Sequence, residues 1–230
     1  MGVNQAQVEL LLSDPSIQPL VSRLMRCVAD HQDVFQLQLD EQTATRLVAY
    51  LALLNKWNAA YNLTAVRNVN DMFSKHLLDS LVVIQYVNEQ RVIDVGTGAG
   101  LPGVPLAILR PEKEVTLLDS NGKKTRFLDH VKMTLGLDNV TVVHARIESQ
   151  TERRFDAVIS RAFTALDNML ALCSNACTDS GVFYAMKGMF PQEELDAVSE
   201  EYQLVSSVKL AVPELDSERH LLTLRKRAFS

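Results

Sequence analysis

The sequence is poor in cysteine. Three cysteines, Cys27, Cys173 and Cys177, are spread over 230 residues, too few and too scattered for a disulfide framework, and this pattern suits a reducing compartment. Cys173 and Cys177 lie four residues apart on an expected helix, but no second pair of ligands lies nearby. We therefore expect buried thiols and no metal site.

Long hydrophobic runs are missing as well. No apolar stretch approaches the roughly 20 residues that a membrane-spanning helix needs. The first residues, MGVNQAQVELLLSD, lack the basic start and apolar core of a signal peptide, and Ala6 stands where a myristoylation signal needs Ser or Thr. We expect a cytoplasmic protein without a membrane partner.

Basic residues are not in excess. The chain has 23 Lys and Arg against 28 Asp and Glu, a net charge of −5, so its overall charge does not indicate a nucleic-acid partner. A local cluster, Lys123, Lys124 and Arg126, follows an expected strand, and charge alone favours a solvated helix face for it. The length of 230 residues suits one α/β domain with a helical annex.

Apolar periodicity changes near residue 88. Before it, helical spacing predicts helices over 17–30, 41–57 and 70–86, the last with Asn70 as its N-cap. After it, short apolar strands alternate with amphipathic helices, which predicts a mostly parallel sheet covered on both faces, with its ligand crevice at the carboxyl ends of the strands. We expect strands at 92–95, 115–119, 140–145, 155–160, 181–188, 203–211 and 219–225, and further helices at 101–110, 123–135 and 166–177.

Three glycines, Gly96, Gly98 and Gly100, follow the first of these strands. Glycine permits positive φ and lets the backbone approach a ligand, and the helix that follows offers free N–H groups to an anion. Gly98, Gly100 and Gly103 also fit the dinucleotide pattern G-x-G-x-x-G, which is weak evidence by itself. The loop alone leaves a pyrophosphate and the carboxylate of S-adenosylmethionine both open.

Two acids favour S-adenosylmethionine. Asp119 ends the second strand and is placed to accept both ribose hydroxyls, which either cofactor would use. Asp94 precedes Gly96 by two residues; there a carboxylate would oppose a pyrophosphate but attract the ammonium of methionine. The alternative for Asp94 is a carboxylate that only caps the turn. After the third strand, the stretch Ala145-Arg146-Ile147-Glu148 is a candidate for contact with the adenine edge.

Motifs of several other reactions are absent. The fourth strand runs into Ser160-Arg161-Ala162-Phe163, with no Asn/Asp-Pro-Pro-aromatic stretch for amine methylation and no thiol for addition to a pyrimidine. Arg161 can hold the cofactor carboxylate, a phosphate or a guanine edge. The main alternative, an NAD-dependent oxidoreductase, explains the glycines and Asp119 but lacks a Tyr-x-x-x-Lys or comparable hydride-transfer set.

From about residue 40 onward, the chain resembles the bacterial 16S rRNA guanine-N7 methyltransferase family, called RsmG or GidB. Residues 1 to about 36 lie beyond the family pattern. The resemblance rests on KWNAAYNLTAVR (56–67), KHLLDSLVV (75–83), IDVGTGAGLPGVPLAI (93–108), TLLDSNGKKTRFL (116–128), FDAVISRAF (155–163), YAMKG (184–188) and ERHLL (218–222).

The resemblance implies a class I S-adenosylmethionine-dependent methyltransferase fold, which is α/β and Rossmann-like with a mostly parallel seven-stranded sheet and an N-terminal helical region. We divide the chain into a helical extension (1–36), a helical region (37–88) and the methyltransferase domain (89–230). The implied activity is transfer of a methyl group to N7 of one guanine in the decoding-region loop of 16S ribosomal RNA. The implied cofactor positions are Gly96, Leu101, Ile147, Glu148 and Arg161.

The acidic net charge favours the small ribosomal subunit over naked RNA as the substrate. The resemblance also favours a phosphate contact for the cluster at 123–126. A second alternative is a non-catalytic rRNA-binding assembly factor that retains the fold.

Guanine N7 carries a lone pair and no proton, so its attack on a sulfonium methyl needs no general base. The protein then has to hold the base in line with the methyl group. Candidates for positioning the RNA are Asn62, His76, Arg161 and Lys187. His76 is equally well explained as a packed histidine bonded to Asp79 or to backbone, and Asn62 as the cap of a turn.

Overall fold

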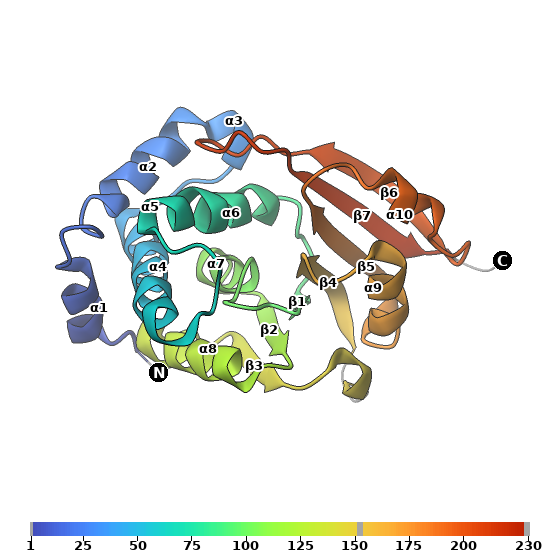
Figure 1. Cartoon of the computed structure of the whole chain (residues 1–230), viewed down its shortest axis with the longest axis horizontal. Coiled ribbons are helices and arrows are strands. Elements are labelled where there is room, and N and C mark those ends of the chain that lie inside the picture. The colour runs from blue at the N-terminus through green and yellow to red at the C-terminus, as the bar shows by residue number, and fades with distance from the viewer. Residues whose placement is uncertain (1, 151–153, 228–230) are drawn as a thin grey trace.

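The computed structural model describes residues 2–150 and 154–227. In this part of the chain, a seven-stranded sheet is flanked by helices, and the first helices gather at one end of the molecule (Figure 1). The strands are β1 (Arg91–Val95), β2 (Glu114–Asp119), β3 (Val140–His144), β4 (Phe155–Arg161), β5 (Cys177–Lys187), β6 (Tyr202–Lys209) and β7 (His220–Lys226). The helices are α1 (Gln5–Leu12), α2 (Leu20–Asp30), α3 (Gln32–Phe35), α4 (Glu41–Tyr61), α5 (Val69–Met72), α6 (Asp79–Ile84), α7 (Gly103–Leu109), α8 (Gly122–Leu135), α9 (Leu166–Cys173) and α10 (Gln192–Asp196), with a π-helical segment Phe73–Leu78 between α5 and α6.

The sheet has the strand order β3-β2-β1-β4-β5-β7-β6. Strands β1 to β5 are parallel, and β7 lies antiparallel between β5 and β6. Strands β1, β2 and β4 are buried runs of mainly apolar residues because helices cover the centre of the sheet, whereas the edge strands β3 and β6 are more exposed. The strand order reverses between β1 and β4, so a crevice is expected at the carboxyl ends of these strands. The predicted mostly parallel seven-stranded sheet is confirmed.

The N-terminal helices and the sheet share a hydrophobic core. Helix α4 is central to it, since ten of its 21 residues are buried. Helices α1 and α2 pack against α4, and one continuous cluster of buried side chains extends from Val8 in α1 to Leu221 in β7. Packing thus joins the three segments 1–36, 37–88 and 89–230. Residues 1, 151–153 and 228–230 of these segments lie outside the described residues.

Several element boundaries differ from those predicted. Helix α1 was not predicted; Asn4 caps it by accepting a hydrogen bond from the Gln7 N–H, and Val8 is its buried residue. The predicted helix over 17–30 begins only at Leu20, and the one over 41–57 continues to Tyr61. The helix predicted from Asn70 is capped instead by Asn68, whose side chain accepts from the Asn70 N–H at 2.8 Å.

The fifth strand begins earlier than predicted. Cys177, expected in a helix, pairs with Phe155 in the sheet, so α9 ends at Cys173 and β5 begins at Cys177. The short helix α10, which follows β5, was also not predicted.

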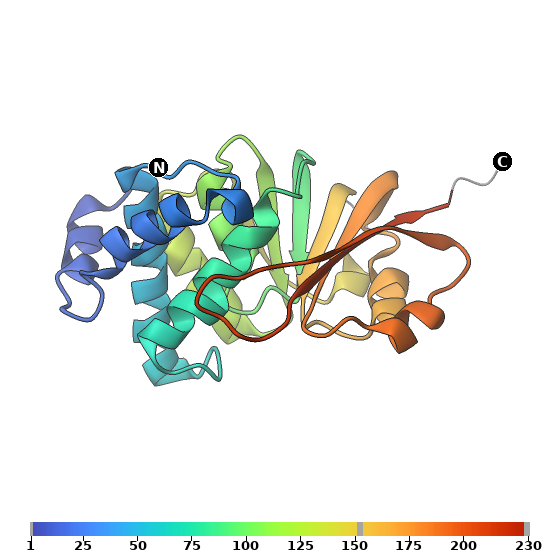
Figure 2. The ribbon, with the colours of Figure 1, turned by 90° about the horizontal axis from the view of Figure 1, so that it is seen from above.

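The loop between β6 and β7 crosses the molecule toward the N-terminal helices (Figure 2). Glu214 in this loop forms an ion pair with Arg23 of α2, and Arg219 near its end forms one with Asp79 of α6. The loop is therefore tied at two points to helices that are far away in the sequence, and Arg219 is brought to the carboxyl edge of the sheet.

Candidate functional site

The loop after β1 requires glycine at defined positions. Gly96, Gly98 and Gly100 have φ values of +64°, +63° and +94°, a region that disfavours other residues. A Cβ atom on Gly96 would lie 2.6 Å from Cδ2 of Phe163, and one on Gly100 would lie 2.5 Å from Val104. Gly96 thus leaves room for an aromatic ring beside the loop, whereas Gly100 leaves room for the following helix.

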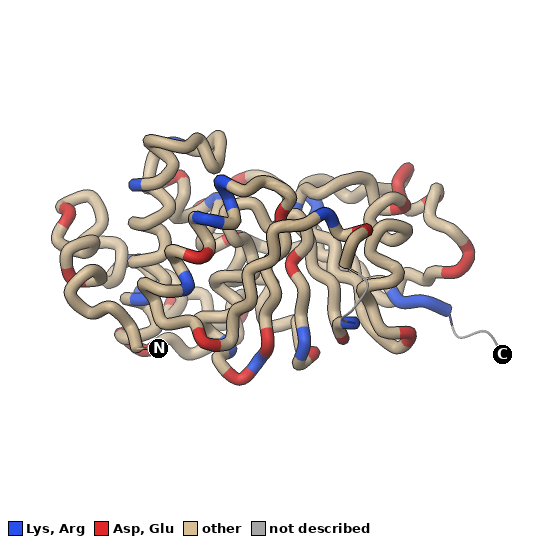
Figure 3. The backbone as a smooth tube through the Cα atoms, turned by 90° about the horizontal axis from the view of Figure 1, so that it is seen from below, with Lys and Arg blue, Asp and Glu red and all other residues tan. Residues whose placement is uncertain are grey.

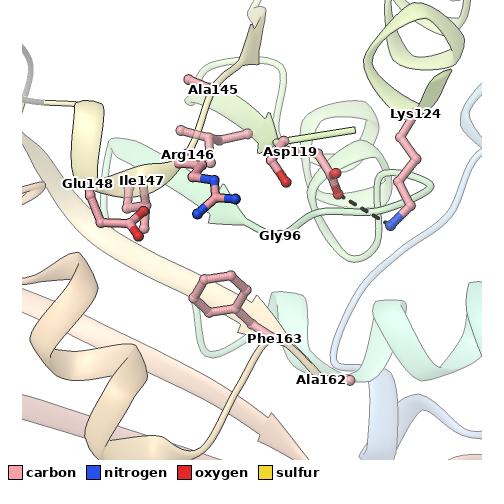
Figure 4. A pocket seen from close by; sticks show the side chains of 11 residues that line it. Gly96, Asp119, Lys124, Ala145, Arg146, Ile147, Glu148, Ala162 and Phe163 are labelled. Atoms are coloured by element: carbon pink, nitrogen blue, oxygen red, sulfur yellow. Dashed lines mark ion pairs between the residues drawn. The ribbon is translucent and has the colours of Figure 1, made fainter. Parts of the chain in front are cut away.

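A first cleft of 370 Å³ lies at the carboxyl ends of β1 to β4 (Figure 4). It brings together four residues singled out from the sequence: Gly96, Asp119, Ile147 and Glu148. The ring of Phe163 lies across the cleft from the segment that carries Ile147 and Glu148 (Figure 4). The remaining lining residues are Leu118, Ser120, Lys124, Ala145, Arg146 and Ala162.

Asp119 is fixed at the edge of the first cleft by backbone donors. Its Oδ2 accepts a hydrogen bond from the Gly98 N–H at 2.9 Å, and its Oδ1 accepts from the Asn121 N–H at 2.9 Å. Lys124 Nζ lies 3.5 Å from Oδ2. An ionised carboxylate has about four acceptor positions, so Asp119 keeps the capacity to accept hydroxyl donors from a ligand.

Asp94 lies beneath the glycine loop rather than on the wall of the first cleft. It is fully buried, and its Oδ2 accepts hydrogen bonds from the Thr97 hydroxyl at 2.6 Å and from the Gly103 N–H at 2.8 Å. Its Oδ1 is also buried and has no hydrogen-bond partner among the described residues. Burial raises the pKa of Asp94 to about 6. Oδ2 therefore caps the turn, as the alternative interpretation of Asp94 expected, whereas Oδ1 can still accept a hydrogen bond from a donor.

Five predicted cofactor positions do not line the first cleft: Asp94, Gly98, Gly100, Leu101 and Arg161. The side chain of Leu101, two residues before α7, is 2% exposed and belongs to the hydrophobic core. Arg161 points instead into a neighbouring cavity. Gly98 and Gly100 shape the loop without lining the cleft.

This second cavity also measures 370 Å³, and Ala162 lines both cavities, so they adjoin at the end of β4. It gathers His76, Arg161 and Lys187, three of the four residues predicted to position a substrate. The other lining residues are Val66, Lys75, Asp79, Met186, Gly188 and Arg219.

Asp79 organises the charge of the second cavity. This buried carboxylate accepts from Arg161 Nη1 at 3.1 Å and from Arg219 Nε at 2.7 Å. Two guanidinium groups on one carboxylate leave a net positive charge, while each guanidinium keeps further donors free for an anion. Neither Asp79 nor Arg219 was identified as a site residue from the sequence, although both lie within the motifs quoted above.

His76 is held by Thr64 and by backbone, not by Asp79. Its Nδ1 lies 3.0 Å from the Lys75 carbonyl, which can only accept, so Nδ1 carries the proton. Its Nε2 lies 2.8 Å from the Thr64 hydroxyl and accepts from it. Burial, followed by the charge of Arg161, lowers the pKa of His76 to about 4. The imidazole is therefore neutral at pH 7.

Lys187 is also engaged. Its Nζ lies 2.6 Å from Glu194 Oε2 and 3.1 Å from the Thr164 carbonyl. Asn62, by contrast, does not join the second cavity. It ends α4 in a left-handed conformation with φ +53° and accepts from Arg67, which matches the turn-capping alternative.

The predicted basic cluster is divided. Lys124 turns toward Asp119 in the first cleft, whereas Lys123 and Arg126 are exposed. On the face drawn in Figure 3, Lys and Arg positions are interspersed with Asp and Glu positions. A phosphate contact by Lys123 or Arg126 stays a prediction.

The cysteines of the described residues were predicted from the sequence as buried thiols without a metal site. The three cysteines are unpaired and buried. Residues 2–150 and 154–227 contain no group of three or more His, Cys, Asp or Glu side chains arranged to hold a metal ion. In the same ranges, none of the helices has both the length and the hydropathy that crossing a membrane would take.

Comparison with known proteins identifies close relatives. A family model described as rRNA small subunit methyltransferase G (GidB) matches residues 43–222. The chain is 49% identical to ribosomal RNA small subunit methyltransferase G of Idiomarina loihiensis, over 85% of this chain and 96% of that protein. It is 50% identical to the protein of the same name from Escherichia coli O1:K1, over 82% of this chain and 92% of that protein.

The fold is also found in solved structures. A predicted O-methyltransferase from Agrobacterium tumefaciens aligns with a TM-score of 0.54 at 19% identity, covering 66% of this chain and 80% of that one. At this identity, the likeness concerns the fold alone.

Proposed function

Because this chain belongs to the rRNA small subunit methyltransferase G family, we propose that it transfers a methyl group from S-adenosylmethionine to N7 of one guanine in the decoding-region loop of 16S ribosomal RNA. The observation that carries the proposal, beyond membership of the family, is the pair of cavities that adjoin at Ala162. A donor and an acceptor base need two adjoining sites of this kind. The small ribosomal subunit is the proposed substrate particle.

The first cleft has the polar groups that S-adenosylmethionine requires. Asp119 has acceptor positions left for the two ribose hydroxyls. Ile147 and Glu148 are the proposed contacts of the adenine, with Phe163 on the opposite side of the cleft. When bound, the cofactor supplies an activated methyl group on a sulfonium centre.

The methionine tail of the cofactor suits the glycine loop. Positive φ at Gly96 and Gly98 favours glycine, and the missing Cβ of each glycine lets a ligand approach the loop backbone. The unpaired Oδ1 of Asp94 is a buried acceptor below it. A buried acceptor without a partner is unfavourable, so a donated hydrogen bond from the ammonium group, directly or through water, would satisfy it. A dinucleotide would instead place its pyrophosphate at this loop, near a carboxylate.

The second cavity is the proposed site of the target guanine. Arg161 and Arg219, held by Asp79, offer donors to a phosphate or to guanine O6. Lys187 adds a third cation, whose charge is balanced by Glu194 until RNA approaches. These residues would bind and orient the base so that N7 faces the methyl group at Ala162.

Proton transfer is not required of these residues. N7 has no proton to lose, so methylation needs alignment rather than a general base. A neutral His76, with its Nε2 occupied by Thr64, is consistent with a positioning role. Leu101 would reach the cofactor only through its backbone, since its side chain belongs to the core.

Two measurements test the proposed function. In calorimetry, S-adenosylmethionine is expected to bind and NADH is not. If NADH binds and S-adenosylhomocysteine does not, the result favours an oxidoreductase instead. Small subunits that lack the modification, incubated with methyl-labelled cofactor, are expected to carry label in their 16S rRNA. Unlabelled RNA despite stable binding of the particle would identify a non-catalytic assembly factor.

A further inference from the structure

Two large apolar side chains are exposed directly after β5. Met189 is 79% exposed and Phe190 is 41% exposed. Among the phenylalanines in the described ranges, Phe190 is exposed and Phe163 is half-buried, whereas five others are fully or almost fully buried. The pair lies between the end of β5 and α10 (Figure 1). Side chains of this size are usually buried, so these two form a small exposed apolar patch; Leu204 and Val205 in β6 form another, which is not next to the second cavity.

The ring of Phe190 is held in place by His220. The two rings meet edge to face, with centroids 5.7 Å apart and planes at 73°. His220 is itself fixed, because its Nδ1 lies 2.9 Å from the Gly188 carbonyl. An aromatic ring held by a fixed neighbour loses little conformational entropy on binding.

Met189 and Phe190 are continuous with the second cavity. Lys187 and Gly188, the residues just before them, line that cavity, and so does Arg219, the residue before His220. Phe190 and His220 are therefore each within two residues, along the chain, of a residue that lines the second cavity. A ligand that fills the cavity and extends outward would pass over Met189 and Phe190.

We propose that Phe190 and Met189 form a stacking platform for an unpaired base adjacent to the target guanine. The proposal rests on the proposed function, since it places the target base in the second cavity. Sequence-specific RNA recognition uses loops whose bases are splayed out and stacked on aromatic side chains. A guanine drawn into a cavity loses its stacking neighbours, and a platform at the cavity mouth would stabilise the neighbour left behind.

The small size of the platform favours a base over a protein partner. A stable protein interface buries about 800 Å² on each side, supplied by some 20–30 residues, whereas this exposed apolar pair consists of two residues. Cations that suit an RNA backbone lie beside it: Lys187, and beyond it Arg161 and Arg219. Lys187 and Glu194 neutralise each other, and Glu193 is a further acid in α10, so the net positive charge near the platform comes from Arg161 and Arg219, which share Asp79.

The test compares substitutions at Phe190 in methylation of the small subunit. Stacking of one base on an aromatic side chain predicts that Phe190→Ala lowers kcat/KM for the particle by roughly 5- to 150-fold. Phe190→Leu, which keeps apolar area but has no π face, should lose a similar factor, and Phe190→Trp should stay within about twofold of the unchanged protein. Affinity for S-adenosylhomocysteine should not change in any variant.

Met133→Ala is the matched control, because Met133 is 58% exposed and lies near the far end of α8. It should leave methylation unchanged, while Met189→Ala lowers it.

Three results would overturn the platform. The first is a kcat/KM of Phe190→Ala within twofold of that of the unchanged protein. The second is full activity of Phe190→Leu, which would indicate an apolar protein contact, and the third is weakened cofactor binding in Phe190→Ala, which would indicate a structural role. If the unchanged protein transfers no methyl group, the proposed function fails instead. Co-sedimentation of the same variants with the particle then decides the platform.

Discussion

The pH dependence of S-adenosylmethionine binding tests the role of Asp94. Burial raises the pKa of this carboxyl from 3.8 to about 6 in the free protein. If the ammonium of the cofactor contacts Oδ1, binding favours the ionised form and brings the pKa back toward 3.8 or below. Affinity should then fall as the pH decreases through 6, because protonation competes with the ligand.

The size of this effect follows from the two pKa values. At pH 5, a group with a pKa near 6 is about tenfold more protonated than ionised, whereas at pH 7 it is almost fully ionised. Between pH 7 and pH 5, the affinity should therefore fall by about tenfold. The free α-amino group, with a pKa near 8, stays charged over this range.

The stability of the free protein should change in the opposite direction. A carboxyl whose pKa is raised by folding contributes stability below its unfolded pKa and loses this contribution as the pH rises. A change from 3.8 to about 6 corresponds to about 3 kcal/mol, lost as the pH rises from about 4 to 6 and beyond. Denaturant unfolding of the cofactor-free protein measures this contribution.

Calorimetry without RNA at pH 5, 6 and 7 is the assay for affinity, and Asp94→Asn is its control. The amide retains an oxygen for Thr97 and Gly103 but does not titrate. The variant should bind weakly at every pH and without the tenfold change. An affinity that is constant between pH 7 and 5, or a pH dependence that survives in Asp94→Asn, would refute contact between Asp94 and the ammonium.

Three further predictions concern other parts of the site. Lys187→Ala removes one charged contact with RNA, so kcat/KM for the small subunit should fall by about tenfold or more while the cofactor Kd stays within about twofold. An equal loss of cofactor affinity would show that Lys187 contacts the cofactor in the first cleft. Gly96→Ala places a Cβ 2.6 Å from Phe163 at a φ of +64°, so calorimetry should find cofactor binding weakened by at least tenfold. Gly2→Ala is its control, because a Cβ there meets nothing within 4 Å. Unchanged binding in Gly96→Ala would contradict the described packing. Burial raises the pKa of Cys27 to about 11 and those of Cys173 and Cys177 to about 12, so a thiol reagent at pH 7 should label the folded protein slowly and all three cysteines after unfolding; rapid labelling of the folded protein would contradict their burial.

The sheet could be predicted from the sequence because most of its strands contain short apolar runs bounded by turns. Its strands start and end within a few residues of the predicted positions, and the largest error has a clear reason. Residues 178–180 are polar and carry no strand periodicity, yet Cys177 pairs with Phe155 across the sheet. Helix α1 has a single buried residue, Val8, too few to give a helical pattern.

The first cleft was predictable in part because its residues follow the strands directly. Gly96, Asp119, Ile147 and Glu148 come together as the alternation of strands and helices implies. The position of Asp94 beneath the loop depends on its contacts with Thr97 and Gly103, which spacing alone does not reveal.

The second cavity depends on contacts between distant segments. Asp79 and Arg219 are 140 residues apart, and the crossing loop between β6 and β7 brings them together. Arg161 was assigned to both cofactor and substrate from the sequence, and its pairing with Asp79 places it in the second cavity. Asn62 was grouped with these residues by motif, but it ends a helix elsewhere.

The central claim, that a methyl group passes from the first cleft to a guanine in the adjoining cavity, is tested most directly by locating the transferred methyl. Small subunits that lack the modification would be incubated with methyl-labelled S-adenosylmethionine, and their 16S rRNA digested and mapped to the labelled nucleotide and atom. We predict one label, on N7 of a single guanine in the decoding-region loop. A label on an exocyclic amine, on a pyrimidine carbon or on a ribose hydroxyl would contradict the account.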